Sequence, residues 1–271
     1  MTEDDHPIET TDYRPPNLES HSITLLERAL YLQRSDTLVV SDLHLGRGAA
    51  SNVDAPVDDD GDTLARLESL VSLTEPETVV VAGDCLHAFS TLPRGVDWSV
   101  TRLERLVADA DADLVITPGN HDGMLESVYD GPRPKLYRPG PGTVVCHGHE
   151  RPELEDKVDE RLGLRDEQQA PEFSSERPAL YIVGHDHPAL SIGGRKRPCL
   201  LFGPGCVDGA DVLMLPAFTK SAAGMTVNRL RGSDFQCPLV SNPDRWYPGV
   251  YDSRLWAVRW FPPLERCRSL L

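Results

Sequence analysis

Residues 37–44 read TLVVSDLH, a short apolar run that ends in an aspartate and a histidine. Residues 78–84 (TVVVAGD) and residues 113–121 (DLVITPGNH) repeat this arrangement of an apolar run followed by polar residues. Short runs of β-branched and aliphatic residues are typical of buried strands. We therefore expect three buried strands, each with a cluster of polar side chains at its carboxyl end.

Helical patterns separate these strands. Asp62 and Asp97 are each followed by apolar residues at helical spacing, so each is expected to cap a helix. Because strands and helices alternate, the first half of the chain predicts an α/β fold. Residues 22–32 predict a β-hairpin ahead of the first strand. The aspartate-rich residues 52–61 are interpreted as a solvated acidic loop.

The second half of the chain changes character and predicts a second sheet. Turns rather than helices separate its expected strands, which lie at residues 143–146, 179–183, 189–192 and 199–202. Residues 151–178 are dense in charged residues and are interpreted as an exposed helix or a lid segment. Residues 241–271 alternate prolines with aromatic residues. We interpret them as a packed edge rather than a base-stacking platform, although arginines interleave the rings.

The length of 271 residues fits one large α/β domain or two smaller ones. The sequence shows no internal repeat and no long linker, so we expect a flexible acidic tail at residues 1–20 and a single domain at residues 21–271. No stretch approaches the roughly 18 apolar residues of a membrane span, and the N-terminus lacks the features of a secretory signal. A soluble cytoplasmic protein with no membrane partner is expected.

The formal net charge of −16 comes with few lysines, since four of the 27 basic residues are lysine and the others are arginine. We interpret this composition as haloarchaeal, because molar salt shortens the Debye length to about 3 Å and screens the repulsion between acidic groups. An ordinary acidic cytosolic protein is the alternative. Salt also screens the attraction to phosphate, so the charge does not exclude a nucleic-acid partner. The six cysteines show no C-x-x-C spacing and are expected to be free thiols.

Five polar clusters stand at the ends of the expected strands. They are D-x-H at residues 42–44, G-D at 83–84, G-N-H-D at 119–122, H-G at 147–148 and G-H-x-H at 184–187. The i, i+2 spacing in the first and last clusters places both members on the same side of an extended segment, so two ligands can converge on one site. Carboxylate, imidazole and amide ligands together suit manganese, iron or zinc better than an all-oxygen calcium or magnesium site.

Two metal ions that lie roughly 3.5 to 4 Å apart need a bridging carboxylate, and Asp84, midway through the set, is the natural candidate. The ordered series of five clusters resembles the calcineurin-like metallophosphoesterases over residues 37–203. The resemblance implies a four-layer α/β/β/α sandwich with two divalent metal ions, manganese being the first choice, at the strand ends. It implies that one metal ion is bound by Asp42, His44 and His187, that the other is bound by Asn120, His147 and His185, that Asp84 bridges them, and that His121 is the acid near the leaving group.

The segment GDCLH, residues 83–87, departs from the G-D-x-x-D pattern of serine/threonine phosphatases, in which the second aspartate orients the catalytic histidine. His87 takes the place of that aspartate, as in the SbcD-type nucleases. Together with LPAF at residues 215–218 and the short length, this pattern most resembles the archaeal SbcD-related phosphoesterases. The resemblance implies that His121 and His87 serve the hydrolysis of a phosphodiester, with DNA and nucleotides as candidate substrates.

Two other functions stay open as alternatives. A nucleotide or small-molecule phosphomonoesterase would use the same metal ligands. A non-catalytic metal-binding scaffold would keep the fold, but every ligand position and His121 are filled, which favours an enzyme. His149, Asp186 and Asp122 lie inside the motifs without being assigned as ligands, so supporting roles are expected. Arg47 is interpreted as an ordinary exposed arginine, with a phosphate clamp as the alternative.

Overall fold

A five-stranded sheet forms the first half of the fold. The structure is a computed structural model, and it describes residues 13–50, 59–88, 90–154 and 177–268. The strand order is β1-β2-β3-β4-β5, in which β3, β4 and β5 are parallel and the β1/β2 hairpin is antiparallel. The predicted hairpin and the three predicted buried strands are confirmed. The strands span Ile23–Leu26 (β1), Ala29–Leu32 (β2), Thr37–Val40 (β3), Thr78–Val81 (β4) and Asp113–Ile116 (β5).

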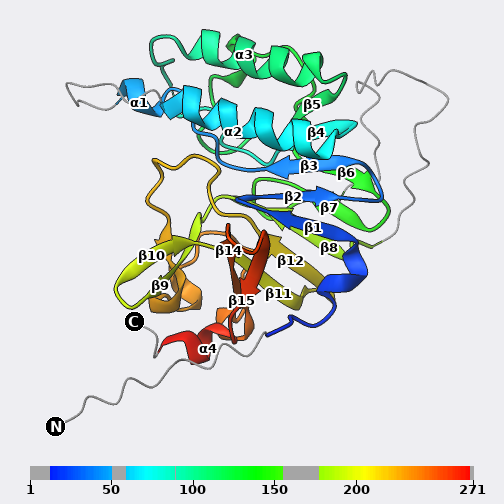
Figure 1. The fold of residues 1–271 in the computed structure, drawn as a ribbon, viewed down its shortest axis with the longest axis vertical. Coiled ribbons are helices and arrows are strands. Elements are labelled where there is room, and N and C mark those ends of the chain that lie inside the picture. The colour runs from blue at the N-terminus through cyan, green and yellow to red at the C-terminus, as the bar shows by residue number, and fades with distance from the viewer. Residues whose placement is uncertain (1–12, 51–58, 89, 155–176, 269–271) are drawn as a thin grey trace.

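A seven-stranded sheet packs against the first (Figure 1). Its order is β15-β14-β11-β12-β8-β7-β6, and β7, β8 and β12 are parallel. The predicted second sheet is therefore confirmed, but the strand expected at residues 189–192 (β9) is not part of it and pairs with β10 and β13 in a separate three-stranded sheet. The strands span Tyr137–Gly140 (β6), Thr143–Val145 (β7), Leu180–Val183 (β8), Pro188–Ile192 (β9), Arg195–Pro198 (β10), Leu200–Val207 (β11), Ala210–Met214 (β12), Met225–Thr226 (β13), Tyr247–Asp252 (β14) and Ala257–Trp260 (β15).

Alternate side chains of the buried strands face two different apolar layers. In β4, Val79 and Val81 pack against the helices α2 (Asp59–Thr74) and α3 (Val96–Asp109), which cover the outer face of the first sheet (Figure 1). Val80 points the other way and packs against the second sheet. Burial of both faces explains why these strands are continuously apolar in sequence.

Short helices and irregular segments cover the far face of the second sheet in the described ranges. The buried side chain of Trp246 packs there with residues of α4 (Leu264–Cys267). The mixed α/β fold is as expected, and the long helices that the structure describes lie on the first sheet. The remaining short helices are α1 (Arg47–Ala50), η1 (Leu18–His21), η2 (Leu125–Ser127), η3 (Val227–Arg229), η4 (Gly232–Asp234) and η5 (Pro243–Arg245).

The interpretation of residues 52–61 as a solvated loop is wrong for residues 59–61, which begin α2. Residues 51–58 lie outside the described residues. Asp60 accepts hydrogen bonds from the backbone N–H of Gly46 at 3.0 Å and from the hydroxyl of Ser99 at 2.6 Å. The aspartate therefore ties the loop after β3 to α2 and α3, instead of facing solvent.

Asp62 and Asp97 lie within the first turns of their helices and do not cap them, contrary to expectation. Gly95 precedes α3 with a φ of 82°, a left-handed conformation that glycine adopts without strain. Aspartates in a first turn still stabilise a helix, because they face the positive end of its dipole. The aspartates therefore indicated where the two helices begin, but not their first residues.

Three of the segments interpreted from the sequence lie only partly within the described residues. Residues 155–176, which make up most of the expected lid, and residues 1–12 of the expected tail lie outside the described residues. The C-terminal segment is a packed edge as interpreted, because β14 and β15 border the second sheet and the ring of Trp260 meets that of Phe202 at 6.4 Å. Among the described residues, no helix is long and apolar enough to cross a membrane.

Replacing Asp60 by alanine is expected to lower the free energy of unfolding by about 1–3 kcal/mol, because the buried N–H of Gly46 loses its acceptor and the hydroxyl of Ser99 keeps only the carbonyl of Gly95, at 3.5 Å. Urea titration followed by circular dichroism measures this change. The control is Glu68→Ala, which removes an exposed carboxylate from the same helix and should cost less than about 0.5 kcal/mol. Equal losses in the two variants would show that the contacts of Asp60 do not stabilise the fold.

Candidate metal centre

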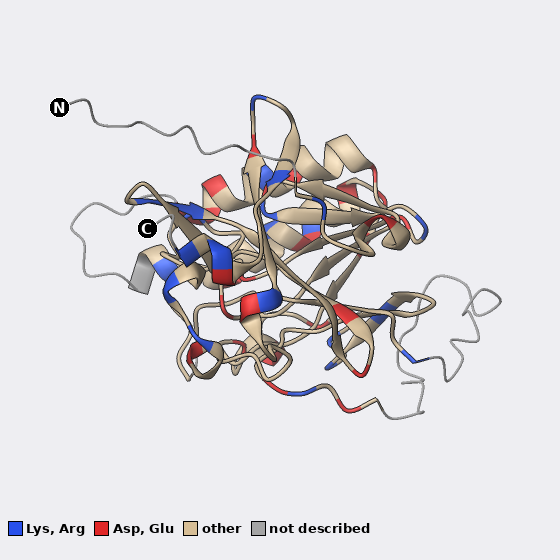
Figure 2. Ribbon diagram, turned by 90° about the horizontal axis from the view of Figure 1, so that it is seen from below, with Lys and Arg blue, Asp and Glu red and all other residues tan. Residues whose placement is uncertain are grey.

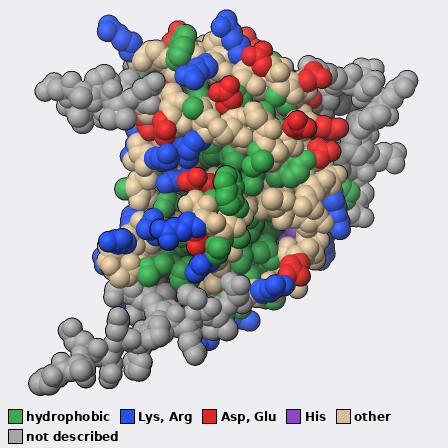
Figure 3. All heavy atoms as spheres, viewed as in Figure 1, with side chains coloured by type: hydrophobic (Ala, Val, Ile, Leu, Met, Phe, Trp, Pro, Cys, Tyr) green, Lys and Arg blue, Asp and Glu red, His purple; other side chains and the backbone are tan. Residues whose placement is uncertain are grey.

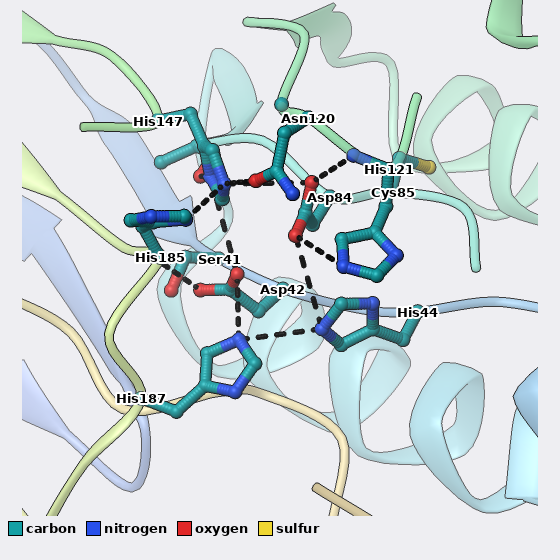
Figure 4. Close-up of polar contacts among 12 residues, drawn as sticks. Ser41, Asp42, His44, Asp84, Cys85, Asn120, His121, His147, His185 and His187 are labelled. Carbon is teal, nitrogen blue, oxygen red and sulfur yellow. Dashed lines mark hydrogen bonds and ion pairs between the residues drawn. The ribbon is translucent and has the colours of Figure 1, made fainter. Parts of the chain in front are cut away.

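Five of the polar residues at the strand ends lie in tight loop turns with left-handed backbone rather than in extended backbone. This corrects the expectation that extended segments bring their side chains together. Left-handed backbone is unfavourable for residues other than glycine and persists where surrounding contacts enforce it. The turns direct the side chains toward one another (Figure 4). Positive φ angles occur at Asp42 (56°), His44 (48°), Asp84 (46°), His185 (72°) and His187 (46°).

Backbone hydrogen bonds join neighbouring loops at the site. The N–H of Asp42, after β3, donates to the carbonyl of Gly83, after β4, at 3.0 Å. In the second sheet, the N–H of Gly184, after β8, donates to the carbonyl of His147, after β7, also at 3.0 Å. The site therefore lies where the carboxyl ends of strands from both sheets meet.

Two glycines allow the loops to approach the carboxylates. A Cβ atom on Gly119 would lie 2.2 Å from Oδ1 of Asp84, and one on Gly184 would lie 2.4 Å from Oδ2 of Asp42. Both distances are far shorter than the roughly 3.5 Å at which non-bonded heavy atoms pack. The G-N-H-D and G-H-x-H motifs therefore need their glycines because no side chain fits there.

One group of potential metal ligands consists of Asp42, His44, Asp84 and His187, which each offer one ligand atom within 4.8 Å of the others. Nε2 of His187 lies 2.9 Å from Oδ1 of Asp42 and 3.3 Å from Nε2 of His44 (Figure 4). The two carboxylates and His44 are buried. Oxygen and nitrogen donors from both sheets thus converge on one small volume.

A second group consists of Asp84, His147 and His185, again with ligand atoms within 4.8 Å of one another. Nε2 of His147 lies 3.4 Å from Oδ1 of Asp84, 3.1 Å from Nδ1 of His185 and 3.1 Å from Oδ1 of Asn120. Asp84 is the member that the two groups share, and Figure 4 shows its carboxylate between them. All seven predicted metal-ligating residues are therefore brought together.

The charges of the two groups suit a divalent cation. Burial lowers the pKa of His44 and of His185 to about 4, so both rings are neutral near pH 7 and keep a lone pair for a metal ion. Burial also lowers the pKa of His147, but its hydrogen bond with Asp84 and the charge of Asp42 outweigh burial and raise that pKa to about 9. A divalent ion would replace such a proton, so anionic carboxylates facing imidazoles are a donor set that fits a metal site.

His121 and His87 lie at the edge of the first group. Their rings stack with centroids 5.2 Å apart and planes inclined by 15°. The backbone N–H of His121 donates to Oδ1 of Asp84 at 2.8 Å, and its ring Nε2 lies 3.9 Å from Oδ2 of the same carboxylate. His44, His87 and His121 also offer nitrogens within 4.8 Å of one another, so this geometry permits either metal contact or proton transfer.

Two further aspartates hold the ligand loops in place. Asp122 accepts hydrogen bonds from the backbone N–H groups of Leu86 and Gly119, both at 2.8 Å, and so joins the G-D loop to the G-N-H-D loop. Burial outweighs these bonds and raises the pKa of Asp122 to about 6. Asp186 accepts hydrogen bonds from two backbone N–H groups of residues 236–237, both at 3.0 Å. Both contacts agree with the supporting roles expected for these residues.

Three residues lie around the two groups without joining them. The half-buried ring of His149 lies 5.2 Å from the ring of His147, beside the second group. Arg47 is half-buried rather than fully exposed, and its charge adds to burial in lowering the pKa of His87, which places it within electrostatic reach of the site. Asp60 positions the loop after β3, and sequence reasoning missed it because an aspartate-rich stretch carries no periodic signal.

The sequence profile of the calcineurin-like phosphoesterases matches residues 36–189, more than half of the chain. The solved structure of the Pseudomonas putida nuclease MPE is similar, with a TM-score of 0.56 and 19% identity, covering 88% of this chain and 94% of that one. The phosphoesterase Yfce of E. coli has a TM-score of 0.40 and 12% identity, with 84% and 98% covered. No curated protein matches the chain.

These findings define the class of the protein. The chain belongs to the calcineurin-like phosphoesterase family, and it is a metal-dependent hydrolase of phosphate esters. Members of this family typically bind two divalent metal ions, and the two groups of potential ligands agree with that number. The likeness to the nuclease, at 19% identity, concerns the fold alone.

Proposed function

We propose that the protein is a phosphodiesterase that uses two divalent metal ions, manganese first and iron or zinc as alternatives. The observation that carries the proposal is the shared position of Asp84 in both groups of potential ligands. When bound, the two ions supply Lewis-acid polarisation of the phosphate and an activated water. In this proposal one ion is held by Asp42, His44 and His187, the other by Asn120, His147 and His185, and both by Asp84.

His121 is the residue that we assign as general acid. Its side chain is 21% exposed, whereas that of Asp84 is 3% exposed, so its ring can meet a substrate that the buried carboxylate cannot reach. Burial lowers the pKa of His121, which makes its protonated form a stronger acid. Protonating the leaving oxygen is a contribution typically worth about 10²- to 10⁴-fold in rate.

His87 supports a diester rather than a monoester as the substrate. Its ring stacks on that of His121, at the sequence position where the phosphatases have an aspartate that orients the catalytic histidine. An imidazole offers no negative charge there, so it leaves the ring of His121 the stronger acid and is free to contact a phosphate oxygen. We therefore propose the SbcD-related subclass, with DNA or a nucleotide as substrate. The nuclease activity of the similar Pseudomonas putida protein is in line with this choice.

A screen of substrates tests the proposed function. The purified protein is assayed with manganese in molar KCl, because its composition suits high salt. The substrates are bis(p-nitrophenyl) phosphate, p-nitrophenyl phosphate, cyclic nucleotides, and single- and double-stranded DNA. Hydrolysis of diesters without hydrolysis of the monoester is expected. Hydrolysis of the monoester alone, or of none of them with both ions bound, would overturn the proposal.

Asp84→Asn should abolish most of the activity and lower the content of both metal ions, because the change removes the charge that both sites share. Metal analysis of the purified variant by mass spectrometry measures this loss. Asp130→Asn makes the same change at an exposed aspartate and should leave metal content and turnover at wild-type values. Two tightly held ions with normal turnover in Asp84→Asn would rule out a bridging carboxylate.

His121→Asn should slow turnover by about 10²- to 10⁴-fold while the metal content stays unchanged, because the side chain is assigned to donate a proton. The loss should be larger for an alkyl leaving group than for p-nitrophenolate, which leaves without protonation. Matched methyl and p-nitrophenyl diesters provide this comparison. If the metal content falls instead, His121 is a ligand within its group with His44 and His87, and another residue is the acid.

His87→Ala is expected to lower diester hydrolysis substantially at unchanged metal content, because a contact to a phosphate oxygen is lost. His87→Asp should shift the ratio of diester to monoester hydrolysis toward monoesters, because it restores the anionic partner that phosphatases place beside the catalytic histidine. Rates on matched nitrophenyl substrates measure both effects. Wild-type rates and ratios in both variants would make His87 a packing residue.

A further inference from the structure

A cavity of about 230 Å³ adjoins the first group of ligands. His187 lines this cavity together with residues of β9, of β10 and of the segment 216–224. Its volume is several times the roughly 30 Å³ that one water molecule takes up in the liquid. The cavity is therefore large enough for a phosphate group and part of the arm that carries it.

The charged side chains around this cavity are basic, although the protein has 43 acidic residues and only 27 lysines and arginines. Arg28, Lys196 and Lys220 line it beside His187, and no carboxylate does so among the residues that the structure describes. Acidic residues occur all over the ribbon (Figure 2), whereas basic side chains gather on the side where β9 and β10 lie (Figure 3). Such a local excess of positive charge selects for an anion.

Arg28 is fixed at a wall that the cavity shares with the metal-ligand loops. Its guanidinium donates to the carbonyls of Ala217 and Thr219 at 2.7 and 3.0 Å. The N–H of Thr219 in turn donates to the carbonyl of Asp42 at 3.3 Å. Burial lowers the pKa of Arg28 only to about 10, so it stays charged at neutral pH. The positive charge of Arg28 is thus connected to Asp42, a proposed metal ligand, through the hydrogen bonds of residues 217–219.

The two lysines provide donors that an anion can use. Nζ of Lys196 donates to the carbonyl of Gly224, which holds the side chain across the cavity wall and leaves further N–H donors on the ammonium. Nζ of Lys220 lies 3.3 Å from Asp62, and both side chains are about half exposed. Exposed pairs of this kind are weak, so a phosphate can compete with Asp62 for Lys220.

We propose that this cavity binds a second, non-scissile phosphate of the substrate, beside the phosphodiester that is hydrolysed. The inference rests on the proposed function, which places the scissile phosphate at the two groups of ligands. Because His187 belongs both to those ligands and to the cavity wall, the two phosphates of one molecule can occupy both places at once. Oligonucleotides have this chemistry, and a nucleoside bisphosphate carries the same two phosphates without a diester that can be hydrolysed.

Equilibrium binding tests the cavity without relying on turnover. Isothermal titration calorimetry compares thymidine 3′,5′-bisphosphate with thymidine 5′-monophosphate, in the lowest salt that keeps the protein folded by circular dichroism. The bisphosphate should bind about tenfold more tightly, which is the size of one good charged hydrogen bond. The same nucleotide with a methyl group on one oxygen of its 3′-phosphate distinguishes an internal phosphate of a nucleic-acid chain from a terminal phosphate. If the tighter binding persists with the methyl group, the cavity is assigned to an internal phosphate. If the tighter binding is lost, the cavity is assigned to a terminal phosphate.

A double variant, Lys196→Met with Lys220→Met, should remove this tenfold preference while binding of the monophosphate stays unchanged. Arg197→Met is the matched control, because Arg197 is the next residue on β10, is exposed, and does not line the cavity. The control should keep the preference. Equal affinities for the two nucleotides in the wild type, or a preference that survives in the double variant, would overturn the assignment.

Kinetics separate this inference from the proposed function. Thymidine 5′-(p-nitrophenyl phosphate) is compared with the same ester carrying a 3′-phosphate. The KM of the second ester should be about tenfold lower in the wild type, and the two KM values should be equal in the double variant. Hydrolysis of both esters with equal KM values would overturn the cavity assignment and leave the proposed function. A binding preference without hydrolysis of either ester would overturn the proposed function and leave the cavity as a phosphate site.

Discussion

Two buried carboxylates, Asp42 and Asp84, are the constraint on which the rest of the structure depends. Burying a charge is costly unless it is paired, and these two are surrounded by imidazoles at hydrogen-bonding and ion-pair distances. The carboxylates follow strands of the first sheet, whereas their partners His147 and His187 follow strands of the second. The electrostatic pairing therefore requires the two sheets to keep one relative alignment, which the apolar layer between them provides.

Aspartates elsewhere in the chain serve a different purpose, which depends on what they face. Asp60, Asp122 and Asp186 accept hydrogen bonds from backbone N–H groups and thereby hold the ends of ligand loops. Every residue type except proline carries a backbone N–H, so these contacts depend on the aspartates and hardly on the side chains of the donor residues. The same residue type thus acts as a candidate metal ligand where it meets imidazoles and as a loop anchor where it meets amides.

Membership of the family accounts for phosphate-ester chemistry, but a shared fold and metal site do not select a substrate. Selection depends on the residues around the two groups of ligands. Here these are the stacked pair of His87 and His121 on one side, and a cavity with three basic side chains on the other. In our proposal the stacked pair favours a diester, and the basic cavity favours a substrate with a further negative charge.

The sequence by itself determined the α/β class, the buried strands and the set of seven candidate ligands. Local patterns suffice for the strands and for the polar motifs at their carboxyl ends, and the resemblance to a known family selected the seven ligands within those motifs. The tertiary structure decided how Asp42 and His44 converge. Both residues have positive φ angles, so a turn and not an extended segment brings their side chains together. The tertiary structure also decided the role of Asp60, because its hydrogen-bond partners Gly46 and Ser99 are distant in sequence. The basic cavity likewise depends on Arg28 and Lys196 lining the same space, and no local pattern can indicate that segments so far apart in the chain lie around one cavity.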